Sequence, residues 1–138
     1  MRIFALAALA AMLVAPSAAK AGDDFIKGVY LQTAELCAQA SKETLQAVIE
    51  AGNVILTANG LEGVEYNCEF VQVTKATRAP AWLVEAICQE PGYLFPDVLS
   101  ITQMNSTQLE LVSVKPADPE SGGGNGGTYV LCEGVAAP

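Results

Sequence analysis

Apolar and polar residues alternate over two stretches of the chain, at 64–73 and at 82–90. This pattern is typical of β-strands that bury one face and expose the other. The two stretches are separated by a short segment that contains Pro80, so they are predicted to form an antiparallel hairpin. The apolar positions on one face of these strands are Val64, Tyr66, Cys68 and Phe70, followed by Trp82, Val84, Ala86 and Cys88.

Shorter apolar stretches between turn residues predict five further strands and one helix. The helix is predicted over 34–48, where Leu36, Ala40, Leu45 and Val48 recur at helical spacing. Six or seven short strands at even spacing predict a mostly β fold, a small antiparallel barrel or sandwich with one short helix. The further predicted strands are 28–31, 54–57, 98–104, 108–114 and 128–132.

The first 21 residues have the pattern of a secretory signal peptide. Arg2 precedes an uncharged apolar stretch at 3–15, and Ala19 and Ala21 are the small residues that a signal peptidase reads. A helix needs roughly 20 apolar residues to cross a bilayer, so the stretch favours a leader cleaved after Ala21 over a membrane anchor. We therefore expect residues 22–138 to be a single domain without an integral membrane segment, periplasmic or secreted.

The predicted mature domain is strongly acidic. It keeps all fifteen acidic residues of the chain but only five of the seven basic ones. Such a charge repels nucleic acid and anionic lipid surfaces, and it favours a basic protein as the partner. Solubility of a small secreted domain is the simpler explanation of the same charge.

All four cysteines lie in the predicted mature domain, and the chain contains no histidine. An exported domain folds in an oxidising compartment, so two disulfides are predicted. A zinc site would use closely spaced cysteine pairs or histidine, and the sequence has neither. We therefore expect no metal and no other cofactor.

Four cysteines allow three disulfide connectivities, and the predicted hairpin favours one of them. In a register in which Thr74 faces Trp82, Cys68 faces Cys88. The Cβ atoms of such opposed residues are roughly 4.5–5.5 Å apart, which is close to the separation that a disulfide requires. The remaining pair, Cys37 with Cys132, would tie the start of the domain to its last strand.

Two segments are expected to be loops. Residues 116–127 contain five glycines from position 122 onward, which predicts a flexible loop. Tyr93, Leu94 and Phe95 lie between Pro91-Gly92 and Pro96-Asp97. This second loop is expected either to fold back over the core or to form an exposed recognition surface.

No catalytic site is predicted. Without histidine, catalysis by a Ser-His-Asp or Cys-His arrangement is excluded. Glu62, Glu65 and Glu69 cluster in the sequence, and Glu65 and Glu69 are expected on one strand face, where a carboxylate pair could serve glycoside hydrolysis. Solvation of the outer face of a strand is the commoner role for such residues.

The leader, the size, the acidity and the disulfide-bonded β domain resemble small periplasmic lysozyme inhibitors. Ser121-Gly122 with Tyr129 resembles the Ser-Gly…Tyr loop of that group, although the spacing here is longer. The resemblance implies a compact barrel that inserts a loop into the cleft of its enzyme. The candidate contact residues from both loops and the last strand are Tyr93, Leu94, Phe95, Ser121 and Tyr129.

The sequence therefore predicts an exported, non-enzymatic binding protein, with inhibition of a basic hydrolase such as lysozyme as the leading hypothesis. An envelope accessory protein that docks on a larger assembly is the alternative. A glycan hydrolase built on Glu65 and Glu69 ranks third.

Overall fold

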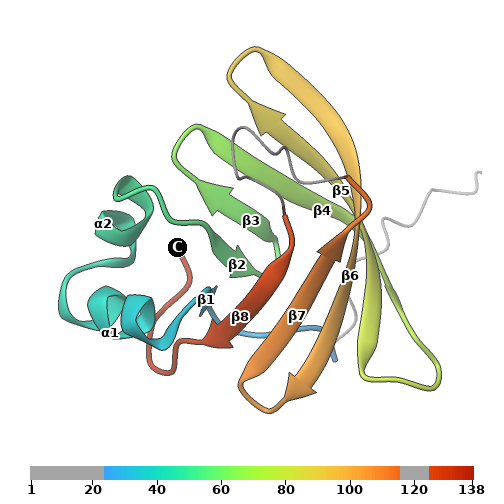
Figure 1. Cartoon of the computed structure of the whole chain (residues 1–138), viewed down its shortest axis with the longest axis horizontal. Coiled ribbons are helices and arrows are strands. Elements are labelled where there is room, and N and C mark those ends of the chain that lie inside the picture. The colour runs from blue at the N-terminus through green and yellow to red at the C-terminus, as the bar shows by residue number, and fades with distance from the viewer. Residues whose placement is uncertain (1–23, 116–124) are drawn as a thin grey trace, which may run out of the picture.

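Eight antiparallel strands close into a barrel in the computed structural model, which describes residues 24–115 and 125–138. Each strand pairs with its neighbours along the chain, and β8 returns to pair with β1 (Figure 1). The predicted leader, and most of the predicted loop at 116–127 including Ser121, lie outside the described residues. The strands are β1 Tyr30–Leu31, β2 Ile55–Thr57, β3 Gly60–Gly63, β4 Tyr66–Lys75, β5 Ala81–Glu90, β6 Tyr93–Asn105, β7 Gln108–Ser113 and β8 Gly127–Leu131.

Two short helices connect β1 to β2, where the sequence predicted one. They are α1, Ala34–Lys42, and α2, Leu45–Glu50. The predicted single helix divides because Thr44 is extended and its hydroxyl accepts a hydrogen bond from the Ala47 N–H at 3.0 Å, which starts a new helix. Neither of these helices is long and apolar enough to cross a membrane.

The strand that the sequence did not predict is β3, which raises the count from six or seven to eight. Two of its four residues are glycines, so the sequence pattern indicates a turn at this place. Gly60 is required by its close approach to β4, because a Cβ atom there would lie 1.8 Å from the Cys68 carbonyl oxygen. Its φ of +152° also favours glycine.

The hairpin of β4 and β5 has the predicted pairing of Cys68 with Cys88. The predicted pairing at its far end is wrong, because a bulge at Val71 shifts the ladder and Thr74 faces Leu83 instead. Val64, expected on the buried face, lies before β4 and is exposed.

The segment predicted as a loop at 93–95 is part of β6, so that prediction is wrong. Tyr93 and Leu94 pair with Glu90 and Gln89 of β5. Pro96 fits within β6 because it lies beyond the end of the β6–β7 ladder, which begins at Leu99. A proline without an N–H therefore removes no bond from that ladder.

Two apolar clusters hold the fold together. The larger fills the barrel and includes Trp82, with Tyr66 and Phe70 partly buried against it, as predicted for these aromatic residues. The smaller lies between the helices and the outer face of β1 and β2. Each cluster contains one disulfide, Cys68–Cys88 in the barrel and Cys37–Cys132 beside the helices, which are the pairs predicted from the sequence.

Candidate binding site

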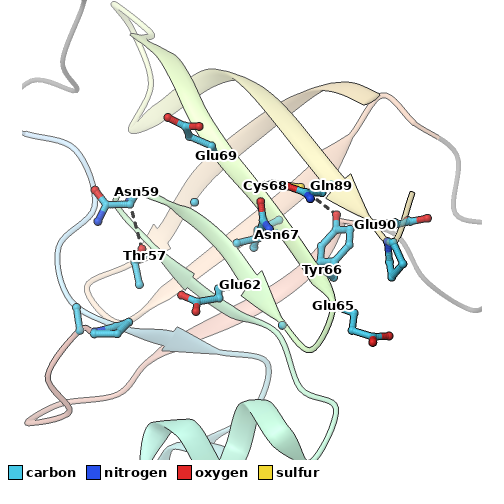
Figure 2. A pocket seen from close by; sticks show the side chains of 16 residues that line it. Thr57, Asn59, Glu62, Glu65, Tyr66, Asn67, Cys68, Glu69, Gln89 and Glu90 are labelled. Carbon is cyan, nitrogen blue, oxygen red and sulfur yellow. Dashed lines mark hydrogen bonds between the residues drawn. The ribbon is translucent and has the colours of Figure 1, made fainter. Parts of the chain in front are cut away.

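A groove with a volume of about 690 Å³ lies over the outer face of β3, β4 and the end of β5 (Figure 2). The C-terminal tail forms another part of its wall. Its lining residues are Thr57, Asn59, Gly60, Leu61, Glu62, Gly63, Glu65, Tyr66, Asn67, Cys68, Glu69, Gln89, Glu90, Pro91, Ala137 and Pro138.

The polar row across the groove follows from strand register. Glu62 of β3 faces Asn67 of β4, which in turn faces Gln89 of β5. All three side chains are exposed, as expected for positions that alternate with the barrel core. Glu69 faces Gly60 across the β3–β4 ladder and adds its carboxylate to the same side of the groove.

The groove is negatively charged. Glu62, Glu65, Glu69 and Glu90 contribute four carboxylates, and none of the lining residues that the structure describes is Lys or Arg. Clustered charge of one sign attracts ligands of the other sign and raises their encounter rate. Within residues 24–115 and 125–138, no group of three or more His, Cys, Asp or Glu side chains is placed to hold a metal ion. The charge of the groove favours a cationic partner.

The predicted carboxylate pair is not on one strand face. Glu65 lies in the turn between β3 and β4 with a φ of 55°, whereas Glu69 lies within β4. In Figure 2 their side chains point away from each other at different ends of the groove. The prediction failed because the strand begins at Tyr66, after the turn, and not at Val64. Glu65 and Glu69 therefore do not form the carboxylate pair on which the hydrolase hypothesis depends.

Behind the groove, the barrel interior contains a polar cluster, which we define as Tyr66, Asp97, Ser113 and Asn125. Asp97 and Asn125 are buried, and Tyr66 and Ser113 are half-buried. Asp97 accepts hydrogen bonds from the Asn125 amide at 2.6 Å, from the Ser113 hydroxyl at 2.7 Å and from the Val98 N–H at 2.8 Å. The Tyr66 hydroxyl donates to the Asn125 side-chain oxygen. The cluster therefore connects β4, β6, β7 and the residues before β8.

Tyr66 belongs both to the groove lining and to the polar cluster. Its hydroxyl also lies 3.0 Å from the Cys68 sulfur (Figure 2). Burial raises the pKa of Tyr66 to about 12, while the hydrogen bond with Asn125 lowers it and the nearby Asp97 charge raises it further. The side chain that backs the groove is thus a neutral phenol at physiological pH.

The shifted pKa of Tyr66 predicts a loss of stability at high pH. Between pH 10 and 12 the unfolded chain ionises this tyrosine while the folded chain keeps its proton, so the free energy of unfolding falls as the pH rises. Because Tyr66 is only half buried, solvent screening limits the loss to about 1 kcal/mol. Urea denaturation of Tyr66→Phe at pH 9 to 11.5 should show a flatter profile than the wild type. Equal slopes for the wild type and Tyr66→Phe would contradict the assignment.

The residues predicted to contact a partner lie in different environments. Tyr93 and Leu94 are 59% and 64% exposed on β6. Phe95 is buried, stacked on Tyr93 with ring centroids 5.5 Å apart and covered by the Lys115 ammonium at 3.4 Å. Tyr129 is buried inside the barrel, where burial raises its pKa. None of these residues lines the groove.

The end of the predicted Gly-rich loop is also more ordered than expected. Asn125 is buried and bonded to Asp97, and Gly127 already belongs to β8. With Tyr129 directed into the core, the Ser-Gly…Tyr resemblance does not supply an exposed tyrosine for insertion into an enzyme cleft.

The geometry defines a closed β-barrel with two disulfides and an acidic outer groove. The chain matches no protein-family model, no curated protein and no solved structure with which it was compared. Its function therefore has to be inferred from the groove and the surfaces around it.

Proposed function

We propose that the protein is an exported, non-enzymatic binding domain that accepts a basic protein partner in the acidic groove. The observation that carries the proposal is the groove itself, with four carboxylates and no basic residue in the part of its lining that the structure describes. The two disulfides support a location in an oxidising compartment, the periplasm or the outside of the cell.

A basic hydrolase such as lysozyme is the partner class that we propose. The predicted mature domain carries fifteen acidic and five basic residues, so long-range attraction would speed its encounter with a basic enzyme. The groove then supplies carboxylates and carboxamides that can accept hydrogen bonds from Arg and Lys side chains. In this proposal the contact surface is the groove and not the Gly-rich loop.

The test is the affinity of the oxidised domain for a basic lysozyme. Glu62→Gln with Glu69→Gln removes two groove charges and is expected to weaken binding about tenfold at low salt, since each such contact contributes about 0.5–1 kcal/mol. Isothermal titration at two salt concentrations measures the effect, and the difference between the proteins should shrink at high salt.

The matched control for this experiment is Glu43→Gln with Glu50→Gln, which changes the net charge equally on the helices and outside the groove. It should change the affinity less than twofold. An equal loss in both variants would show that net charge and not the groove is recognised. No binding by the wild type would overturn the choice of lysozyme as partner.

A second candidate function, docking on a larger envelope assembly, is favoured by an apolar outer face on β5 to β7. Ile87 lies opposite Pro96, Leu94 and Val112 are 64% and 57% exposed on β6 and β7, and Val114, just after β7, is 72% exposed. Apolar side chains gathered on one face of a soluble protein commonly mark an interaction surface. Retention in a large envelope complex on mild extraction, with no lysozyme binding, would favour this second function.

A further inference from the structure

Three residues that precede β1 close one end of the barrel, and we call Asp24, Phe25 and Ile26 the plug. The Phe25 and Ile26 side chains are buried and belong to the core inside the barrel. The Phe25 ring packs edge-on against Trp82 and Phe70, with centroid distances of 5.6 and 6.3 Å. In Figure 1 this blue segment passes the end of the barrel that carries the β4–β5 turn.

The plug is held by side chains alone. The Asp24 carboxylate forms an ion pair with the Lys75 ammonium, and both groups are about half exposed. Within the described part of the chain, no backbone hydrogen bond joins residues 24–28 to a strand. Gly28, with a φ of +93°, separates the plug from β1 and can act as its hinge. Displacement of the plug would therefore break no hydrogen bond of the barrel ladder.

The plug leaves one polar group beneath it without a partner. Trp82 is only 5% exposed, and its buried indole N–H has no hydrogen-bond acceptor among residues 24–115 and 125–138. A buried donor without an acceptor is unfavourable, so an acceptor brought by a ligand would be favoured there. Lys75 lies directly opposite Trp82 in the β4–β5 ladder, so both side chains project from the same side of the hairpin. Both donors therefore belong to the same side and the same end of the hairpin.

The plug has the same sequence of chemical groups as an amphiphilic carboxylate. Its carboxylate pairs with the Lys75 ammonium, and the apolar side chains that follow lie inside the barrel. We propose that this end of the barrel is a binding site for a single-chain amphiphilic carboxylate of the fatty-acid type, which displaces the plug. The ligand carboxylate replaces that of Asp24 beside Lys75 and accepts the Trp82 indole N–H. Its hydrocarbon chain fills the space that Phe25 and Ile26 now occupy. Arg78, in the adjoining β4–β5 turn, adds positive charge at this end.

Trp82 is the only tryptophan in the chain, so its fluorescence reports on the site directly. Titration with decanoate below its micellar concentration should give a saturable change in Trp82 emission. Asp24→Asn with Phe25→Ala should bind decanoate at least tenfold more tightly, because the competing plug is weakened. If that variant does not fold, Asp24→Asn alone, at an exposed position, should still bind severalfold more tightly than the wild type.

The role of the anionic head is tested with Lys75→Gln in the Asp24→Asn background. Decanoate should bind about tenfold more weakly than without the Lys75 change, whereas decanol should bind equally to both proteins. Lys42→Gln, which makes the same charge change on α1, should leave decanoate binding unchanged. The proposal falls if no saturable change occurs in any variant, or if decanol and decyltrimethylammonium bind as tightly as decanoate. Glu62→Gln with Glu69→Gln should not alter decanoate binding, so this result is independent of the groove.

Discussion

Replacing Cys37 and Cys132 by alanine is expected to lower the free energy of unfolding by about 4–5 kcal/mol, the largest effect of any change proposed for this protein. The two cysteines are 95 residues apart in the chain, so their disulfide removes much of the freedom of the unfolded state. The bond also joins α1 to the residue after β8, and both sulfurs lie in the cluster beside the helices. Urea denaturation of the oxidised wild type and the double variant measures the difference.

The second disulfide provides the comparison for this experiment. Cys68 and Cys88 are only 20 residues apart, and the chain-entropy model gives about 3 kcal/mol for so short a loop. Cys68→Ala with Cys88→Ala should therefore cost less through the unfolded state, although it also removes sulfur atoms from the core. A loss below about 1 kcal/mol for the Cys37 and Cys132 variant would contradict the stabilising role assigned to that bond.

The second large effect is expected at Asp97. Asp97→Ala should lower the free energy of unfolding by about 3 kcal/mol, because the buried Asn125 amide and the partly buried Ser113 hydroxyl and Val98 N–H lose their Asp97 acceptor. Asp97→Asn keeps one acceptor oxygen and should cost about half as much. Thermal and urea denaturation of both variants give the comparison.

Glu85→Ala is the matched control for Asp97. Glu85 faces Val98 across the β5–β6 ladder but points outward and is exposed, so its loss should change the stability by less than about 0.5 kcal/mol. Equal effects at Asp97 and Glu85 would show that the polar cluster contributes nothing beyond the removal of a charge. An intact Asn125→Ala variant with wild-type stability would contradict the cluster in the same way.

The parts of the fold that follow simple alternation could be predicted from the sequence. The inward positions of β5 repeat every second residue, and the opposition of Cys68 and Cys88 followed from the same period. The prediction failed where one residue breaks the period. The bulge at Val71 shifts the ladder, and the glycines of β3 conceal a strand because their role is a close approach between backbones.

The candidate site could be predicted only in part. Glu62 and Glu69 were identified from their clustering, but Glu90 enters the groove through the β4–β5 pairing, which brings a distant segment beside them. The burial of Asp97 and Asn125 could not be predicted from the sequence, because both residue types are common in turns. Their burial depends on the closed barrel that surrounds them. Tyr93 to Phe95 belong to β6 because they pair with β5, and this pairing could not be predicted from the sequence, where the two flanking prolines indicate a loop.

The pairing of β1 with β8 has a consequence for the order of folding. Tyr30 faces Leu131, so the contact that completes the barrel joins residues about a hundred positions apart, whereas β2 to β7 form successive local hairpins. Contacts between distant residues form slowly because a long loop must first be closed. A chain synthesised from its N-terminus therefore cannot close the barrel until β8 is available for pairing. Until then, the edge of β1 that pairs with β8 stays without a partner strand.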